Sequence, residues 1–329
     1  MHIGIIGSGN VGITSAFAIA ERGSGHILLY GRTDGKAQGK ALDLAEAGPI
    51  RRYDRRIRGT SDLEDLMEVD VLVVAAGKPR TAGMSRYDLF DDNNCYIQEL
   101  AALLRDRYKK LEPEEAAAFG AGHQKPEPPV VIMLTEPVDV MTLAFQRFTG
   151  WPRERVMGVG SLLSSTRMRY FVARELGLSA ADVDAMVVGT HGERAVVLER
   201  YSRVSGLTLD QFLSREQVDA IVDRTLGAGT EIVEQAKVGS SFYTPGAAVG
   251  TLVQAIVSDA GRVLPVSVVL DGEYGATGVA ASVPARIGKG GVQQVYELQL
   301  TGDERKAWEE SIAFQRPHAE RVLEGGCHA

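Results

Sequence analysis

The first residues of the chain decide its fold. His2-Ile3-Gly4-Ile5-Ile6 has the apolar pattern of a buried strand, and it continues without a spacer into Gly7-Ser8-Gly9-Asn10-Val11-Gly12. A helical pattern follows over Ile13 to Glu21. Glycines at such a strand-to-helix turn allow a tight bend and a close approach of a pyrophosphate, which then faces the helix N-terminus. The pattern in this setting predicts a dinucleotide-binding domain with these cofactor-binding residues: Gly7, Gly9, Asn10, Val11 and Gly12.

The end of the expected second strand distinguishes between the two nicotinamide cofactors. His26 to Tyr30 has the strand pattern, and Gly31, Arg32 and Thr33 follow it. An acidic residue at this place accepts hydrogen bonds from the ribose 2′-hydroxyl of NAD, whereas an arginine accommodates the 2′-phosphate of NADP. We therefore expect NADP(H), bound through Gly31, Arg32 and Thr33. NAD(H) remains the alternative, in which Arg32 is a solvated surface arginine.

Composition limits the class of protein. A length of 329 residues favours two domains, and a formal net charge of −7 argues against general nucleic-acid binding. No apolar run reaches membrane-spanning length, and a strand that starts at residue 2 leaves no room for a signal peptide. Cys95 and Cys327 are far apart and lack metal-type spacing, so we expect no disulfide framework and no metal site. The expected location is cytoplasmic, with no membrane or nucleic-acid partner.

Strand and helix patterns alternate through the first half of the chain. Strands are expected near residues 27–30, 71–75 and 130–135, and helices near 36–45, 88–107 and 138–148. The alternation predicts an α/β fold with a Rossmann-type doubly wound parallel sheet over residues 1–150. A proline-, glycine- and charge-rich stretch at 109–129 is expected to be an exposed insertion.

The pattern changes after about residue 150. Helices are expected near 161–177, 215–238 and 303–323, and strands near 185–188, 264–270 and 282–287. This change predicts a second domain over residues 151–329, an α+β unit that carries the substrate.

Three arginines and one histidine occur in stretches that together have a recognisable order. Residues 75–89 read AAGKPRTAGMSRYDL and contain Arg80 and Arg86. Arg167 lies in LSSTRMR at 163–169, and His191 lies in GTHGE at 189–193. With these motifs the chain resembles the lactate/malate dehydrogenase family over nearly its whole length, from the glycine-rich turn to Gly272-Glu273-Tyr274-Gly275 and Ile287-Gly288-Lys289-Gly290-Gly291.

The resemblance implies a role for each of these side chains. Arg80 is similar to the family's mobile-loop arginine that recognises the second carboxylate of a dicarboxylic substrate. Arg86 is similar to the arginine that polarises the reacting carbonyl, and Arg167 to the clamp on the 2-carboxylate. His191 matches the general acid/base that protonates the carbonyl oxygen while hydride arrives, and Asn93 matches a residue near the cofactor ribose. The resemblance thus implies a reductase of a small anionic, malate/oxaloacetate-like 2-oxo carboxylate, assembled as a homodimer or homotetramer. The residues at the end of the second strand add the expectation that its cofactor is NADP(H).

Two positions at the centre of this chemistry, Ser164 and Glu136, differ from the family pattern. Together with His191 and Arg86, they are the catalytic candidates. Ser164 stands where a carboxylate orients the histidine, and Glu136 stands where an asparagine precedes a proline. Two interpretations of Glu136 are open: it replaces the missing acid as the partner of His191, or it faces the reacting centre and favours a positively charged substrate such as an imine. A third possibility is a relative that binds the cofactor without catalysis.

Overall fold

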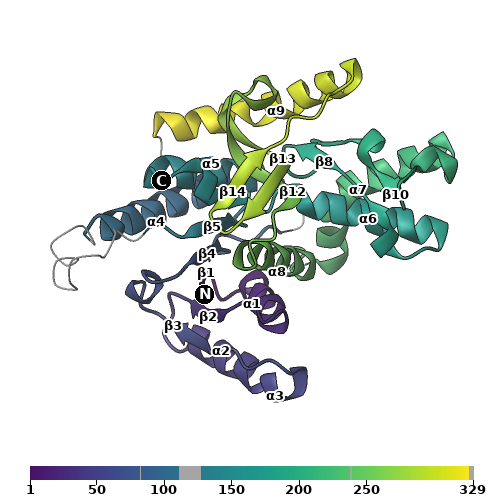
Figure 1. Ribbon diagram of the computed structural model, residues 1–329. Helices are drawn as coiled ribbons and strands as arrows, with labels where there is room; N and C mark the ends of the chain where they lie inside the picture. The colour runs from purple at the N-terminus through teal and green to yellow at the C-terminus, as the bar shows by residue number, and fades with distance from the viewer. Residues whose placement is uncertain (82, 111–126, 238, 326–329) are drawn as a thin grey trace.

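The computed structural model describes residues 1–81, 83–110, 127–237 and 239–325 (Figure 1). Most of the insertion expected at 109–129 lies outside these residues. Lys109 and Lys110, which we expected in the insertion, instead end a helix.

A parallel sheet forms the first part of the molecule, and its central strand is the one that the glycine-rich turn follows. The strands are ordered β3-β2-β1-β4-β5-β6, which is the Rossmann order. Every residue of β4 and β5 is buried, as is typical of parallel strands covered on both faces. The bounds are β1 (His2–Ile6), β2 (His26–Tyr30), β3 (Ile57–Thr60), β4 (Val71–Val74), β5 (Val130–Met133) and β6 (Val156–Gly158).

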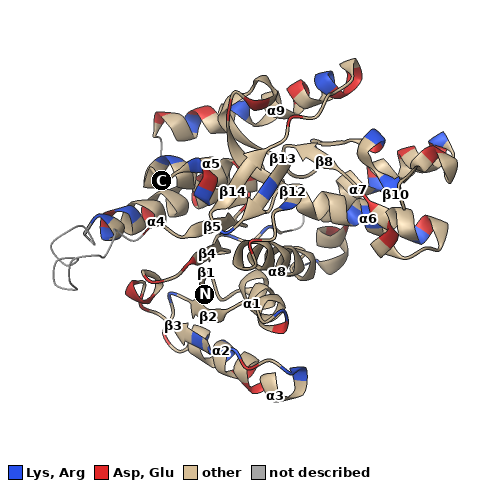
Figure 2. Cartoon of the chain, viewed as in Figure 1, with Lys and Arg blue, Asp and Glu red and all other residues tan. Residues whose placement is uncertain are grey.

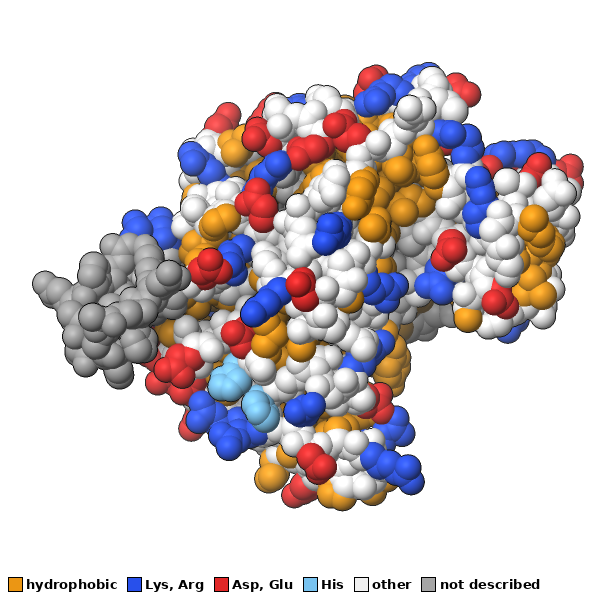
Figure 3. Space-filling model, in the orientation of Figure 1, with side chains coloured by type: hydrophobic (Ala, Val, Ile, Leu, Met, Phe, Trp, Pro, Cys, Tyr) orange, Lys and Arg blue, Asp and Glu red, His pale blue; other side chains and the backbone are white. Residues whose placement is uncertain are grey.

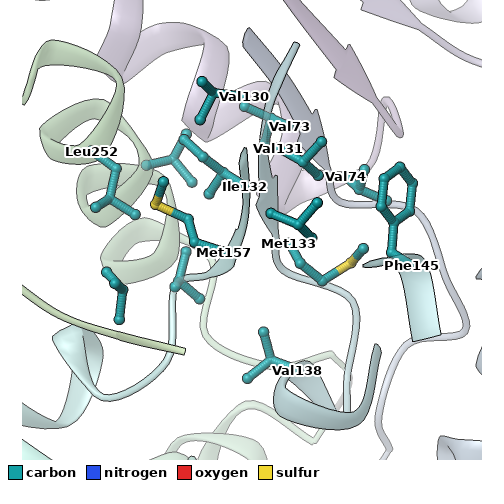
Figure 4. Close-up of a cluster of buried hydrophobic side chains, with 14 of the residues drawn as sticks. Val73, Val74, Val130, Val131, Ile132, Met133, Val138, Phe145, Met157 and Leu252 are labelled. Carbon is teal, nitrogen blue, oxygen red and sulfur yellow. The ribbon is translucent and has the colours of Figure 1, made fainter. Parts of the chain in front are cut away.

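Helices cover the two faces of this sheet. One side carries α1 packed against α8, and the other side carries α4 and α5 (Figure 1). Figure 4 shows side chains of β4, β5 and β6 between Phe145 of α5 and Leu252 of α8. The bounds are α1 (Asn10–Glu21), α2 (Lys36–Glu46), α3 (Gly48–Arg51), α4 (Phe90–Lys110), α5 (Val138–Thr149) and α8 (Tyr243–Val257).

The sheet continues into the second half of the chain through antiparallel strands. β12 pairs with β6, and β13, β8 and β9 follow it, with β14 paired to β13. The bounds are β8 (Val187–Gly189), β9 (Ala195–Val197), β12 (Arg262–Asp271), β13 (Thr277–Gly288) and β14 (Gly291–Val295). A small separate sheet contains β7 (Val183–Asp184), β10 (Arg203–Val204) and β11 (Leu207–Thr208), and three long helices complete this half: α6 (Leu162–Leu176), α7 (Arg215–Ala236) and α9 (Gly302–Glu324).

The predicted fold class is confirmed: a doubly wound, Rossmann-type sheet is followed by a mixed α+β part. The boundary at 150/151 stays a prediction. Charged side chains are spread over α2, α3, α4 and α9, whereas α8 carries none (Figure 2). The face seen in Figure 3 accordingly mixes positive, negative and apolar side chains. No helix among the described residues is both long and apolar enough to span a membrane.

One expectation about the cysteines is wrong. Cys95 on α4 is disulfide-bonded, and the only other cysteine in the sequence, Cys327, lies outside the described residues. The C-terminal part of α9 lies beside the start of α4, the helix that contains Cys95. Arg321 of α9 forms an ion pair with Asp91 of α4, and the rings of His318 and Phe90 are 4.9 Å apart.

Candidate active site

A pocket of about 680 Å³ opens at the carboxyl ends of β1, β2 and β4. Six of the predicted cofactor-binding residues line it, from three separate segments: Gly7, Gly9, Gly31, Arg32, Thr33 and Asn93. This is the edge at which a doubly wound sheet binds its ligand. Asn10, Val11 and Gly12 begin α1 and are not among the lining residues.

The glycine-rich turn has the geometry that a pyrophosphate requires. Gly7 has a φ of +113°, and a Cβ on Gly12 would lie 1.8 Å from the Gly7 carbonyl oxygen, so neither position tolerates a side chain. A Cβ on Gly9 would meet nothing within 4 Å, so this stretch of backbone is open to an approaching group at the N-terminus of α1. The residues therefore fit a dinucleotide, with Gly12 supporting the turn rather than lining the pocket.

The end of β2 presents positive charge. Arg32 lies over the Tyr96 ring, 5.7 Å from its centroid, and Lys36 lines the same pocket. Asp34, the first carboxylate after β2 in the sequence, accepts hydrogen bonds from Gln38 and Ser61 and does not line the pocket. The third cation of the pocket, Lys78, is neutralised by Asp92 at 2.6 Å. Within the described part of the chain, Arg32 and Lys36 have no ion-pair partner.

Asn93 connects this pocket to the catalytic candidates. It is buried, and its Oδ1 accepts the Lys78 backbone N–H at 2.7 Å. Its Nδ2 donates to the backbone carbonyl of Glu136, also at 2.7 Å. A single side chain thus fixes the loop after β4 against the loop after β5.

A second pocket, of about 410 Å³, contains Arg80, Arg86 and His191. Arg80 donates from Nη2 to the Thr230 hydroxyl at 3.2 Å and from Nε to the Met84 carbonyl at 2.5 Å. Burial and the neighbouring Arg86 lower the pKa of Arg80. The structure therefore brings the two loop arginines and the histidine together, as the sequence predicted.

Glu136 lies between two of these groups. Its Oε1 is 3.3 Å from Arg86 Nε and 3.5 Å from His191 Nε2, while Oε2 accepts the Val138 backbone N–H at 3.1 Å. Burial by itself raises the pKa of Glu136, but His191, Arg86 and the Val138 amide outweigh it and lower the pKa to about 2. Glu136 is therefore ionised at neutral pH and already paired.

Arg167 lies beside Arg86 because two glycines leave space for the guanidinium groups. A Cβ on Gly229 of α7 would lie 2.5 Å from Arg86 Nη2 and 3.4 Å from Arg167 Nη1, and a Cβ on Gly192 would lie 2.7 Å from Arg86 Nη1. Arg167 Nε is buried without a hydrogen-bond partner. Burial, helped by the nearby charge of Arg86, lowers the pKa of Arg167 to about 10.

The histidine has a carboxylate neighbour that the sequence did not suggest. His191 donates its backbone N–H to Asp139 Oδ2 at 2.6 Å, and Asp139 is buried at the start of α5. Burial raises the pKa of Asp139 to about 6 against the opposing effect of His191. His191 Nδ1 is buried without a partner. Asp139 Oδ1 is buried and makes no hydrogen bond of standard geometry, although the nearby Ser267 hydroxyl acts to lower the pKa of Asp139. Ser164 is buried on α6, one turn before Arg167, and its hydroxyl makes no hydrogen bond to the described residues.

Sequence reasoning missed several residues that line the two pockets or lie beside their arginines and histidine. Asp139, Gly229, Lys36 and Tyr96 were not predicted. One signal was available: Asp139 is the only charged residue in the apolar start of α5, VDVMTLAF, where a buried carboxylate requires a partner. Among the described residues, no three His, Cys, Asp or Glu side chains are grouped as a metal site would require.

Comparison with known proteins identifies the relatives of this chain. The description "lactate/malate dehydrogenase, NAD binding domain" matches residues 1–110, and "lactate/malate dehydrogenase, alpha/beta C-terminal domain" matches residues 162–323. Malate dehydrogenase from Roseiflexus sp. is 41% identical over 302 residues, which cover 92% of each chain. Malate dehydrogenase from Chlorobium luteolum is 37% identical over 95% of this chain and 96% of its own.

Solved structures agree with this assignment. The malate dehydrogenase from Aeropyrum pernix superimposes with a TM-score of 0.87 at 36% identity and covers 97% of both chains. The malate dehydrogenase from Cryptosporidium parvum gives a TM-score of 0.89 at 30% identity. With its glycine-rich turn, its paired domains and its near full-length relatives, the chain belongs to the lactate/malate dehydrogenase family.

Proposed function

We propose that the protein is an NADP(H)-dependent oxidoreductase whose substrate is a small 2-oxo carboxylate with a second anionic group, as in oxaloacetate. The observation that carries this proposal is the charge of the site. Arg86 is paired with Glu136, whereas Arg80 and Arg167 have no ion-pair partner among the described residues. Two unpaired guanidinium groups beside one histidine suit a substrate with two anionic groups.

Each side chain has a task in this reaction. A bound nicotinamide supplies or accepts the hydride. Arg167 holds the 2-carboxylate through its planar fork, and Arg80 holds the second anionic group. Arg86 donates to the reacting oxygen, and His191 Nε2, the ring nitrogen on the side of Arg86 and Glu136, gives or takes the proton. The pairing with Arg86 keeps the negative charge of Glu136 from dominating the site.

The substrate proposal is tested by comparing 2-oxo acids with and without a second carboxylate. We expect fast NADPH oxidation with oxaloacetate or a longer 2-oxo diacid and slow oxidation with pyruvate. Arg80→Gln should lower kcat/KM for the diacid by about 10- to 100-fold, the value of one charged hydrogen-bond pair. Arg194→Gln is the matched control, because Arg194 lines the same pocket but lies 5.2 Å above the Phe314 ring. Equal losses in the two variants would refute the role of Arg80.

The cofactor proposal rests on Arg32 and Lys36, the two unpaired cations at the end of β2. Arg32→Ala should weaken NADPH binding by about 10- to 100-fold and NADH binding much less, because only NADPH has the 2′-phosphate. Lys78→Ala serves as the control, since Asp92 neutralises Lys78 and its loss should affect both cofactors alike. Binding is measured by cofactor fluorescence. If Arg32→Ala weakened the binding of NADPH and NADH equally, Arg32 would not recognise the 2′-phosphate, and NAD(H) would be the favoured cofactor.

A second candidate function follows from the position of Glu136. A carboxylate 3.5 Å from His191 Nε2 is well placed to stabilise a cationic C=N group, so an imine formed from a 2-oxo acid and an amine is the alternative substrate. Turnover that requires ammonia or an amine, and that disappears in Glu136→Gln, would favour it. A cofactor-binding relative without catalysis is excluded by any turnover that His191→Ala abolishes.

A homodimer or homotetramer in the cytoplasm also remains a proposal. Leu42 of α2 and Ile50 of α3 are exposed at 61% and 84%, which suits a contact between subunits. A monomer in sedimentation experiments would contradict this part.

A further inference from the structure

The inference concerns the ring nitrogen of His191 that faces away from the reacting groups, and it rests on the proposed role of His191. Nδ1 is buried and has no hydrogen-bond partner. In a catalytic histidine, the hydrogen bond made by one ring nitrogen decides which nitrogen carries the proton of the neutral ring. A base that accepts a proton at Nε2 must therefore hold its other proton at Nδ1, and something must accept a hydrogen bond there.

The groups around His191 narrow the choice of acceptor. Glu136 approaches Nε2, so it stands on the opposite side of the ring, with Arg86 behind it. Ser164 makes no hydrogen bond to the described residues, and a hydroxyl carries no charge that would stabilise an imidazolium. Tyr87, from the loop that carries Arg86, has a buried hydroxyl without a partner, which donates its proton more readily than it accepts one.

Asp139 is the remaining carboxylate, and it is already attached to the same residue. Its Oδ2 accepts the His191 backbone N–H at 2.6 Å. Its Oδ1 is buried and makes no hydrogen bond of standard geometry, although the nearby Ser267 hydroxyl favours its charged form. The backbone nitrogen and Nδ1 of one histidine are only four bonds apart. A carboxylate that holds the first is therefore within reach of the second, through a small side-chain rotation or through one bridging water.

We propose that Asp139 is the positioning residue of His191, supplying the carboxylate that keeps the ring proton on Nδ1 and leaves Nε2 free to exchange a proton with the substrate. Two buried polar atoms without a hydrogen bond of standard geometry, Asp139 Oδ1 and His191 Nδ1, then satisfy each other. The arrangement removes the need for a carboxylate at Ser164. It also assigns different tasks to the two acids, with Asp139 behind the ring and Glu136 in front of it.

The test is the position of the proton on the ring, which needs neither cofactor nor substrate. In protein labelled with ¹⁵N-histidine, the two ring nitrogens of neutral His191 have different chemical shifts when only one carries the proton. The sequence contains six histidines, and the His191 signal is the one lost in His191→Gln. We expect the wild-type protein to carry the proton on Nδ1. A proton on Nε2 in the wild-type protein would overturn the proposal without any variant.

Variants then identify the acceptor. Asp139→Asn keeps an oxygen for the backbone N–H but places an amide donor near Nδ1, so the proton should move to Nε2. Ser164→Asp in the same chain should return it to Nδ1. Glu136→Gln is the control, because it removes the carboxylate at the other nitrogen and should leave the proton on Nδ1. A proton that stays on Nδ1 in Asp139→Asn would overturn the role of Asp139.

Kinetics separate this inference from the proposed function. If the protein reduces a 2-oxo acid, Asp139→Asn should lower kcat by at least about tenfold with a much smaller change in KM, and Ser164→Asp should recover part of the loss. A fall in kcat with no recovery and no change in the ring proton would assign Asp139 a purely structural role. The protein could also be inactive on every 2-oxo acid while its Nδ1 proton still depends on Asp139. That result would support this inference and contradict the proposed function.

Discussion

Glu136, a partly buried residue, shows how competing effects decide the charge of one side chain. Burial alone favours its neutral form, because a carboxylate loses hydration. Three neighbours reverse that preference: His191, whose Nε2 lies 3.5 Å away, Arg86 at 3.3 Å and the Val138 amide at 3.1 Å. The carboxylate therefore remains charged and paired with Arg86, while Arg80 and Arg167 have no ion-pair partner among the described residues.

The same competition predicts how Glu136→Gln changes stability with pH. Because folding lowers the pKa of Glu136 from 4.5 to about 2, its charged form contributes stability above pH 4.5, and this contribution is lost as the pH falls toward 2. At neutral pH we expect Glu136→Gln to lower the free energy of unfolding by about 1.5–3 kcal/mol, the range for hydrogen bonds to charged groups. The difference from wild type should shrink between about pH 4.5 and pH 2, as measured by urea unfolding.

Glu193→Gln provides the comparison for that experiment. Glu193 lines the same pocket, but its carboxylate accepts a hydrogen bond from the Thr230 hydroxyl and not from an arginine. Its replacement should change the free energy of unfolding by less than about 0.5 kcal/mol. A gap between wild type and Glu136→Gln that stays constant down to the acid limit of the folded protein would contradict the account of Glu136.

The sequence identified the site residues that belong to contiguous motifs. Arg80, Arg86 and His191 were found in this way, and the structure places them in one pocket. Asp139 was missed because its partner is the backbone of His191, 52 positions away in the sequence. Gly229 was missed for the same reason, since its importance lies in the space it leaves for Arg86.

At the scale of elements, the contact between α1 and α8 depends on small residues. A Cβ on Gly246 would lie 2.7 Å from the backbone carbon of Thr14, and a Cβ on Gly250 would lie 3.0 Å from the Ala18 Cβ. Thr14 also donates its hydroxyl to the Phe242 carbonyl at 2.8 Å. The two helices therefore approach more closely than ordinary side chains allow, and this approach holds the start of α1 beneath the cofactor pocket.

Replacing one glycine tests this contact. Gly246→Ala should lower the free energy of unfolding by about 1–3 kcal/mol, because the added methyl group meets backbone atoms that cannot move aside. Gly39→Ala, inside α2, is the matched control: its Cβ meets nothing within 4 Å, and it should raise stability by about 0.5–1 kcal/mol. The measurement is chemical unfolding of both variants. Equal effects in the two variants would mean that Gly246 is not under packing constraint.

Helix α8 is a long helix that the sequence did not predict. Most other long helices were predicted near their observed bounds, but α8 was missed altogether. Its sequence, YTPGAAVGTLVQAIV, contains Pro245 and two glycines, which usually indicate a turn. Pro245 is tolerated because it lies in the first turn, and the glycines are required by α1. Tertiary packing therefore decides this element, and local propensity does not.

At the scale of the whole molecule, one sheet joins the two halves of the chain. β6 ends the parallel part, and β12 pairs with it antiparallel through Gly158–Ser267 and Met157–Val268. The main hydrophobic core also contains residues from both halves, from Ile3 of β1 to Val322 of α9. The proposed boundary near residue 150 thus falls within a continuous hydrogen-bonded sheet, which a change in helix pattern along the sequence does not reveal.

This continuity predicts that the two halves unfold together. The chain has two tryptophans, and each reports on a different half. Trp151 packs against Tyr108 and Phe145 of α4 and α5, with ring centroids 5.1 and 5.6 Å away, while Trp308 of α9 lies 4.7 Å from the Tyr274 ring. In Trp151→Phe the remaining fluorescence reports on the second half, and in Trp308→Phe it reports on the first.

We expect each variant to give the same unfolding midpoint by fluorescence as by far-UV circular dichroism, because breaking the β6–β12 pairing exposes the shared core to water. The pocket proposed for NADPH is lined by residues of the first half, yet NADPH should raise the midpoint in both variants by the same amount if the halves form one cooperative unit. A shift confined to Trp308→Phe, which reports through Trp151, would instead show that the parallel sheet and the second half unfold separately. In that case the pairing of β6 with β12 would contribute little to cooperative unfolding, and the boundary near residue 150 would separate two units that unfold independently.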